Sequence, residues 1–159
     1  MKLYIYIIAV IGSSYLFGQD LAWNQEVVTF KSANPFSFQE IIMNLDNEPV
    51  QDVSGILTLP EDFDPNIKYP LIIGVAGSLN WGTHHLKYLK MFQEMGFATF
   101  QLQSFDSRDV KSTVGSQTEV TTAMVVLDSY RALETLSTHP NIDIDRSGIT
   151  GWSLGGGVS

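Results

Sequence analysis

Hydrophobic residues along this chain form short runs that alternate with polar turns. Residues 26–31 and 51–59 carry apolar and β-branched side chains in runs typical of strands, and the second run ends at Pro60. The pattern over residues 36–45 is mixed in period, so it favours neither a strand nor a helix. The following stretch, 61–69, is rich in Asp, Pro and Asn and predicts a surface loop.

An almost wholly apolar run at residues 71–76, between Pro70 and Gly77, predicts the first central strand of a sheet. A strand without polar alternation is typical of a parallel sheet whose two faces are both covered. A second β-prone run follows at residues 97–102. Strand, helix and strand thus recur within about thirty residues, the spacing of a βαβ unit, which favours a parallel sheet.

Two helices are predicted beside these strands. The first is expected to be capped by Thr83 and to end at Gly96, with apolar residues along one side. The second is expected to begin with a capping box formed by Ser116 and Glu119 and to end at His139. Its apolar residues follow at helical spacing: Val120, Met124, Leu127, Tyr130 and Leu133.

Residues 151–155, Gly-Trp-Ser-Leu-Gly, carry the clearest sign of chemistry in the chain. A polar turn is predicted at 141–146 and a short strand at 148–150, so the pentapeptide lies where a strand should give way to a helix. Gly-x-Ser-x-Gly in that context is typical of a nucleophile elbow, which exposes a serine hydroxyl at a sharp turn. Ser153 is therefore the candidate catalytic nucleophile.

A serine nucleophile also needs hydrogen-bond donors that stabilise the oxyanion formed during acyl transfer. The backbone N–H of Leu154, directly after the serine, is the first candidate donor. The second is the backbone N–H of Ser78, in the loop after the first central strand, where Gly77 permits a tight approach. Alternative interpretations of the pentapeptide are a glycine-rich structural turn or a phosphate-binding helix start, although it lacks a Gly-Lys-Ser/Thr ending.

The composition is that of a globular protein, with 44% apolar and 16% charged residues among 159. The formal net charge is −8 with nine Lys and Arg, which argues against nucleic acid as a partner, because phosphate binding requires clustered basic residues. The absence of cysteine excludes disulfides, thiolate nucleophiles and thiolate metal ligands. We expect no cofactor and no metal, and the oligomeric state is left open.

The N-terminal residues differ from the rest of the chain, because Lys2 precedes an unbroken apolar run at 3–11 and small residues follow it. This order is typical of a signal peptide, with cleavage near Gly18. The expected organisation is a signal peptide at 1–18 and one domain at 19–159, exported to the periplasm or secreted. A transmembrane anchor is the alternative, but the apolar stretch is shorter than the ~20 residues that a span needs. No stable membrane anchor is therefore expected after cleavage.

From Tyr69 onward the chain closely resembles the dienelactone hydrolase family. The matching segments are SFDSR at 104–108, STVG at 112–115, DSYRAL at 128–133, HP at 139–140, DIDR at 143–146 and GWSLGG at 151–156. The resemblance implies an α/β-hydrolase fold, a three-layer sandwich with a mostly parallel central sheet, incomplete at its C-terminal end. It also implies a carboxylic-ester or lactone hydrolase with Ser153 as nucleophile. Two positions differ from parts of the family. The oxyanion loop begins with His in many relatives and with Ala76 here. The founding enzymes use a cysteine nucleophile, whereas this chain has Ser153 and resembles the serine branch of the family.

Histidines are the usual bases for a serine nucleophile, and three are present. His84 and His85 follow the loop that carries Ser78, but in α/β-hydrolases the histidine comes after the nucleophile in the chain. They are therefore interpreted as polar residues of the first turn of a helix. His139 is interpreted as a partner of a helix C-terminus.

Two further groups of residues have both a structural and a functional interpretation. The charged loop with Asp106, Arg108 and Asp109 is interpreted as solvated surface held by local ion pairs, with contact to a ligand as the alternative. Trp81 and Trp152 are candidates for lining an apolar acyl pocket, Trp152 especially because it precedes the serine, and core packing is the alternative for Trp81.

The sequence as a whole predicts the N-terminal part of a hydrolase that cleaves a small-molecule ester or lactone through an acyl-enzyme on Ser153. The triad acid and histidine are expected beyond residue 159, so the chain by itself is expected to be unstable and inactive. Alternatives are an exported serine peptidase or acetyl-xylan esterase of the same fold, or a non-catalytic binding protein. An Asp or Glu followed by a His, encoded after residue 159, would favour catalysis.

Overall fold

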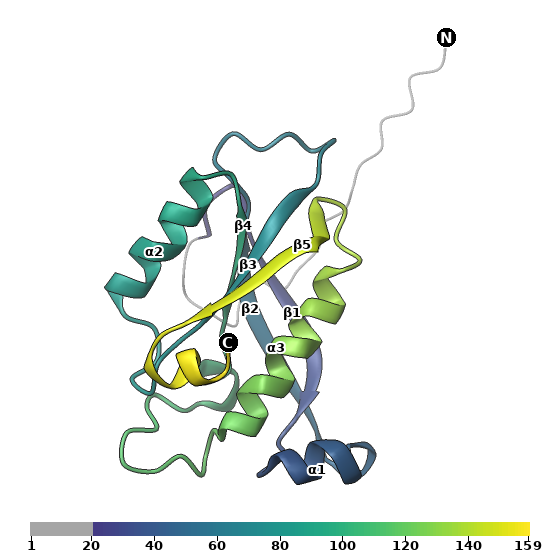
Figure 1. Cartoon of the computed structure of the whole chain (residues 1–159), viewed down its shortest axis with the longest axis vertical. Helices are drawn as coiled ribbons and strands as arrows, with labels where there is room; N and C mark the ends of the chain where they lie inside the picture. Colours follow the sequence, from purple (N-terminus) through teal and green to yellow (C-terminus); the bar gives the residue numbers. More distant parts are fainter. Residues whose placement is uncertain (1–20) are drawn as a thin grey trace.

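The computed structural model of the chain describes residues 21–159 (Figure 1). The signal peptide predicted at residues 1–18 lies outside the described residues. Helices flank one sheet with the strand order β1-β2-β4-β3-β5, so the predicted α/β class is confirmed. The strands are β1 (Gln25–Ala33), β2 (Val50–Thr58), β3 (Tyr69–Val75), β4 (Ala98–Leu102) and β5 (Ile142–Gly151).

The sheet is mixed. β1 and β2 pair antiparallel with Gln25 opposite Thr58, and β2 is also antiparallel to β4. β3 lies between β4 and β5 and is parallel to both. The parallel part of the sheet contains the predicted βαβ unit. Its central strand, β3, leads directly into the loop that carries Ser78.

β5 is longer than the sequence suggests, and the turn predicted at 141–146 is wrong. The strand begins at Ile142, which lies opposite Tyr69, and its register with β3 shifts between Pro70 and Leu71. The polar residues of this stretch lie at the irregularity, where Arg146 Nε donates to Asp143 Oδ2 at 2.6 Å. An irregular edge strand tolerates polar side chains, and its sequence therefore resembles that of a turn.

The ambiguous region at 36–45 forms a short helix, α1 (Phe38–Met43), followed by the 3₁₀ turn η1 (Leu45–Asn47). Ser37 caps α1, because its hydroxyl accepts a hydrogen bond from the Glu40 N–H while the Glu40 carboxylate accepts from the Ser37 N–H at 3.2 Å. Six helical residues are too few to show a clear helical period in the sequence.

Both longer helices form, and each begins at a different residue from the predicted one. α2 (Thr83–Glu94) has Gly82 as its N-cap residue, and Thr83 is already helical. α3 (Thr122–Leu136) is capped by Thr121, and the predicted capping box at Ser116 and Glu119 does not form. The Thr121 hydroxyl accepts from the Met124 N–H and donates to the Pro35 carbonyl at 2.9 Å. A tertiary contact far along the chain therefore decides where α3 begins.

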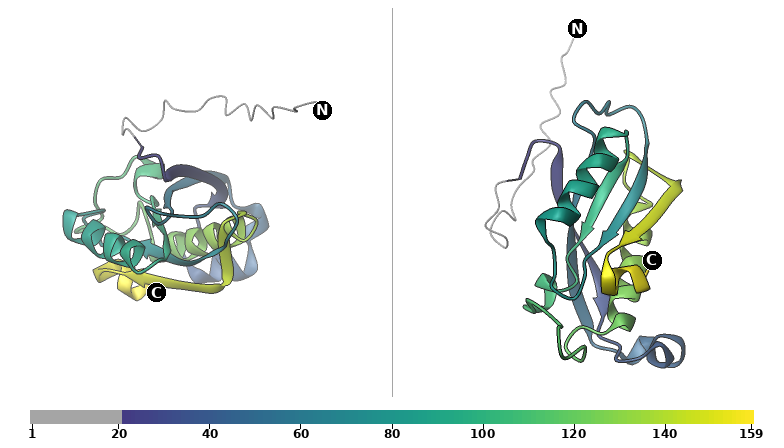
Figure 2. Two further views of the ribbon diagram at one scale, coloured as in Figure 1. Left: turned by 90° about the horizontal axis from the view of Figure 1, so that it is seen from above. Right: turned by 60° about the vertical axis from the view of Figure 1, so that its left-hand side comes forward.

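The sheet lies between α2 and α3 (Figure 2). On the α2 side, Gln93 Nε2 donates to Thr99 Oγ1 of β4 at 2.7 Å. On the α3 side, the Ser32 hydroxyl of β1 donates to Asp128 at 2.5 Å. Within residues 21–159, no helix is long and apolar enough to cross a membrane. The largest fully buried apolar side chains are those of Phe100, Phe105, Leu57, Leu71, Leu136, Ile142, Val53, Val75, Val120 and Val125.

A buried ion pair joins α3 to the segment after β4. Arg108, at the end of the 3₁₀ turn η2 (Asp106–Arg108), donates from Nη1 to Asp128 Oδ2 at 2.7 Å and from Nη2 to Oδ1 at 3.1 Å. The Arg108 side chain is only 6% exposed and that of Asp128 is fully buried. The interpretation of Arg108 as solvated surface is therefore wrong. Its partner lies 20 residues further along the chain, beyond the reach of a local pattern.

We expect the Asp128→Asn substitution to lower the free energy of unfolding by about 3–5 kcal/mol, because it leaves the Arg108 charge buried without its counterion. Urea denaturation measures the change. Glu134→Gln is the matched control, since Glu134 pairs with Arg131 at the surface, where their side chains are 69% and 41% exposed. That substitution should change stability by less than about 1 kcal/mol. Equal effects of the two substitutions would contradict the prediction.

Candidate functional site

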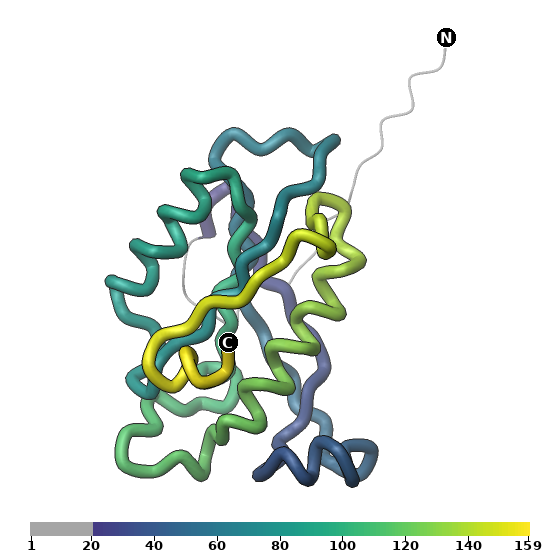
Figure 3. The backbone as a smooth tube through the Cα atoms, viewed as in Figure 1, coloured from purple at the N-terminus to yellow at the C-terminus, as the bar shows by residue number. Residues whose placement is uncertain are grey.

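The backbone turns sharply between β5 and the 3₁₀ helix η3 (Ser153–Gly157), near the yellow end of the chain (Figure 3). Ser153 is the first residue of η3. Ser153 has a φ of 53°, in the left-handed region that residues other than glycine rarely adopt, and it is exposed to solvent. The Trp152 N–H donates to the Val75 carbonyl of β3 at 3.2 Å. Residues 151–155, called the elbow below, therefore have the strained strand-to-helix geometry that the motif predicts.

The two glycines of the elbow are required by close backbone contacts. A Cβ atom on Gly155 would lie 2.3 Å from the Val75 carbonyl oxygen, and one on Gly151 would lie 2.0 Å from the Gly155 carbonyl oxygen. Only glycine fits at such distances. The elbow is thus packed against the end of β3, which holds Ser153 in place.

The loop after β3 lies directly against the elbow. A Cβ atom on Gly77 would lie 3.0 Å from the Trp152 carbonyl oxygen and 3.5 Å from Ser153 Cβ. Ser78 and Leu154 are the next residues along these two segments. Among residues 21–159, no acceptor forms a hydrogen bond with the N–H of either residue. Each candidate donor thus directly follows a residue of this contact, Gly77 or Ser153, and its N–H has no partner within the described residues.

An aromatic cluster packs around Trp152 of the elbow. The Trp152 ring stacks on His85 with centroids 4.7 Å apart, and it packs edge-to-face with Trp81 with centroids 5.9 Å apart. Trp81 Nε1 donates to the Leu102 carbonyl of β4 at 2.9 Å. The structure therefore brings both candidate tryptophans together, in contact with α2 and the sheet.

The histidines have partners other than the serine. His85 lies in the first turn of α2, as predicted, but it is only 5% exposed, and its Nδ1 accepts from the Gly82 N–H at 3.1 Å. Burial, together with the neighbouring His84, holds the pKa of His85 below its usual value near 6.5. His139, predicted to face a helix C-terminus, lies just after α3 and contacts Glu26 of β1 at 2.7 Å.

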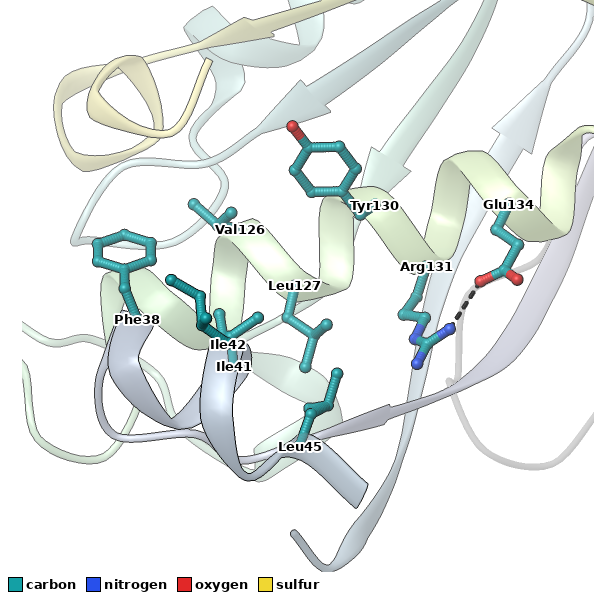
Figure 4. Close-up of a pocket in the computed structure, with 9 residues that line it drawn as sticks. All are labelled: Phe38, Ile41, Ile42, Leu45, Val126, Leu127, Tyr130, Arg131 and Glu134. Carbon is teal, nitrogen blue, oxygen red and sulfur yellow. Dashed lines mark hydrogen bonds and ion pairs between the residues drawn. The ribbon is translucent and has the colours of Figure 1, made fainter. Parts of the chain in front are cut away.

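A groove in the described part of the chain lies apart from the elbow. An apolar groove of about 370 Å³ separates α1 from α3, with Ile42 and Tyr130 on its two walls (Figure 4). None of the predicted site residues lines this groove. Within residues 21–159, no three His, Asp or Glu side chains lie close enough together to hold a metal ion.

Several solved structures with a similar fold are hydrolases. A dienelactone hydrolase-like promiscuous phosphotriesterase from metagenomic libraries matches 83% of this chain at 14% identity, with a TM-score of 0.56. A thermophilic esterase from Thermogutta terrifontis matches 67% at 17% identity (TM-score 0.51), and dipeptidyl peptidase 4 from Porphyromonas gingivalis matches 82% at 18% identity (TM-score 0.50). The predicted α/β-hydrolase fold is thereby confirmed.

The match covers only part of each of these proteins. It spans 52% of the phosphotriesterase, 38% of the esterase and 17% of the peptidase. The chain thus spans about half the length of the dienelactone hydrolase-like structure. No protein-family model matches the chain, and no curated protein matches it.

The elbow contact predicts the effect of adding one methyl group. Gly155→Ala should lower the free energy of unfolding by about 3 kcal/mol, the upper end of the usual cost of overpacking, because the new Cβ overlaps the Val75 carbonyl. Gly157→Ala is the matched control, since nothing lies within 4 Å of a Cβ there, and it should stay within about 0.5 kcal/mol of the parent. Thermal denaturation of both variants tests the contact. A Gly155→Ala protein as stable as Gly157→Ala would contradict it.

Burial of neutral His85 predicts that stability depends on pH. Because the folded-state pKa is lowered, the unfolded state binds the proton more readily, so the stabilisation is complete above about pH 6.5 and is lost as the pH falls toward the lowered pKa. His85→Gln keeps an acceptor for the Gly82 N–H but does not titrate, so stability should fall less steeply between pH 6.5 and about 5. Exposed His84→Gln should retain most of the slope, as measured by urea denaturation across this range.

Proposed function

We propose that this chain is the N-terminal part of a serine hydrolase of the dienelactone hydrolase type that cleaves a carboxylic ester or lactone. The observation that carries the proposal is the exposed Ser153 at φ 53°, held by the glycine contacts of the elbow. The N–H groups of Leu154 and Ser78 have no partner within residues 21–159, which supports their proposed role as donors. The hydrolase fold supports the same conclusion. The substrate would be a small molecule, and the pattern of residues 1–18 supports export to the periplasm or secretion.

The proposed reaction proceeds in two steps. Ser153 Oγ attacks the acyl carbon as its proton passes to a base, and the N–H groups of Leu154 and Ser78 donate to the oxyanion. The C–O bond then breaks and the alcohol oxygen takes up that proton; the alcohol leaves from an ester, whereas in a lactone it stays attached to the acyl group as a hydroxyl. Water then hydrolyses the acyl-enzyme to release the acid and regenerate the serine. The proposal places the histidine base and its acidic partner outside residues 1–159, in keeping with the chain order of α/β-hydrolases.

A serine peptidase is the second candidate, because a dipeptidyl peptidase shares the fold over 82% of this chain. The same elbow would then act on an amide. Relative rates on a p-nitrophenyl ester, a lactone and a dipeptide amide in the complete protein separate the two candidates. An acetyl-xylan esterase would prefer acetylated sugars, and a binding protein would hydrolyse none of these substrates.

Ser153→Ala in the complete protein should lower kcat/KM for p-nitrophenyl acetate by at least about 10⁴-fold, because the substitution removes the attacking oxygen. It should also abolish covalent labelling by a fluorophosphonate reagent. Ser116→Ala is the control, since Ser116 is exposed in a loop, where its hydroxyl shares a hydrogen bond with Thr118 Oγ1 at 2.8 Å. A Ser153→Ala protein that retains activity or labelling would overturn the proposed function.

A further inference from the structure

The loop that carries Ser78 is a tight turn at residues 77–80, called the Ser78 turn below. The Asn80 N–H donates to the Gly77 carbonyl at 2.9 Å and closes the turn. Asn80 has a φ of 63°, and asparagine is one of the few residues that adopt this left-handed conformation readily. Ser78 lies inside the turn, so the direction of its N–H depends on how the turn is held.

A second segment, residues 103–113 after β4, holds the Ser78 turn from outside. The Ser78 carbonyl oxygen accepts hydrogen bonds from the Thr113 N–H at 2.9 Å and from the Ser112 hydroxyl at 3.1 Å. At the other end of the turn, Asn80 Nδ2 donates to Asp106 Oδ1 at 2.9 Å. The turn is therefore fixed at both ends by groups more than 25 residues away along the chain.

Residues 103–113 are themselves firmly anchored. Arg108 donates to the Ser104 carbonyl at 2.9 Å within the segment and to Asp128 of α3 at 2.7 Å. Thr113 is 1% exposed. A contact from Asp106 to Asn80 is thus a contact with a fixed part of the molecule, and it restrains the Ser78 turn.

We propose that Asp106, acting through Asn80, is a positioning residue that holds the Ser78 N–H in the direction needed to stabilise the oxyanion. This inference rests on the proposed function. An oxyanion donor is effective only when it is fixed in place before the reaction, at 2.7–3.1 Å from where the oxygen will be. A turn free to shift would still allow substrate to bind but would stabilise the transition state less. Within residues 21–159, neither Asp106 nor Asn80 forms a hydrogen bond with Ser153, so both would act through the turn.

Asn80→Gly in the complete protein removes this contact, and glycine keeps the left-handed backbone. It also removes the hydrogen bond that Asn80 Oδ1 accepts from the Trp81 N–H at 2.9 Å, which Asp106→Ala leaves in place. We expect kcat for p-nitrophenyl acetate to fall about tenfold with KM changed less than about twofold, since complete loss of a donor costs about 10²–10³ and this donor is displaced rather than removed. Binding of phenylboronic acid, which forms a tetrahedral adduct with a serine, should weaken by about the same factor. Asp109→Gly is the matched control, because Asp109 is exposed and has a φ of 56°.

A double-mutant cycle with Asp106→Ala distinguishes positioning from general loosening of the fold. If the two side chains act through their shared hydrogen bond, Asp106→Ala also lowers kcat about tenfold, and the double variant is no worse than Asn80→Gly alone. The inference would be overturned if the double variant lost about 100-fold in kcat, which would mean that the two substitutions act independently. It would also be overturned if the single variants lost as much in 1/KM as in kcat, or if Asn80→Gly had the same kcat as Asp109→Gly.

The outcomes separate this inference from the proposed function. If Ser153→Ala retains the activity of the parent protein, the proposed function is wrong and the positioning role falls with it. If activity depends on Ser153 but Asn80→Gly behaves like Asp109→Gly, the serine hydrolase stands and the positioning role alone is wrong.

Discussion

The buried pair of Arg108 and Asp128 is the contact on which the arrangement of the other elements depends. A charge with so little exposure is tolerated only when its hydrogen bonds are satisfied, and Arg108 meets this requirement with partners from separate segments. Its guanidinium donates to both carboxylate oxygens of Asp128 in α3, to the Ser104 carbonyl, to the Ala33 carbonyl at 3.0 Å and to Asn34 Oδ1 at 2.7 Å. The end of β1, the segment after β4 and α3 must therefore take up their positions together.

This arrangement reaches the candidate site through the segment after β4. Its residues hold the Ser78 turn, while the glycine contacts of the elbow fix Ser153 against the end of β3. The carboxyl ends of parallel strands meet at one edge of a sheet, and open α/β folds place their ligands there. The serine and its predicted oxyanion donors thus lie at the edge where β3 and β5 end. Backbone contacts at Gly151 and Gly155 hold the serine, and hydrogen bonds from residues 106–113 hold the Ser78 turn.

Much of the fold was predictable because its signals are local. The apolar run at 71–76, the β-prone run at 97–102 and the spacing between them indicated the strands on either side of α2. The errors arose where a distant contact outweighed a local signal. Ser116 and Glu119 form a valid capping box in sequence, but α3 begins at Thr122 because Thr121 also bonds to Pro35. The sequence carries only a weak signal for the Ser78 turn, namely Gly77 followed three residues later by Asn80. Glycine and asparagine are common in loops of every kind, so this spacing does not specify a particular turn.

The sequence by itself determined which residue is the candidate nucleophile and why glycines surround it, because the elbow is a local backbone conformation that five consecutive residues specify. Only the tertiary structure decided that Arg108 is buried and paired with Asp128, and that Asp106 reaches Asn80. These contacts join residues 20 and 26 positions apart across different elements, and no periodicity in the chain marks which partner a charged side chain in a loop will meet.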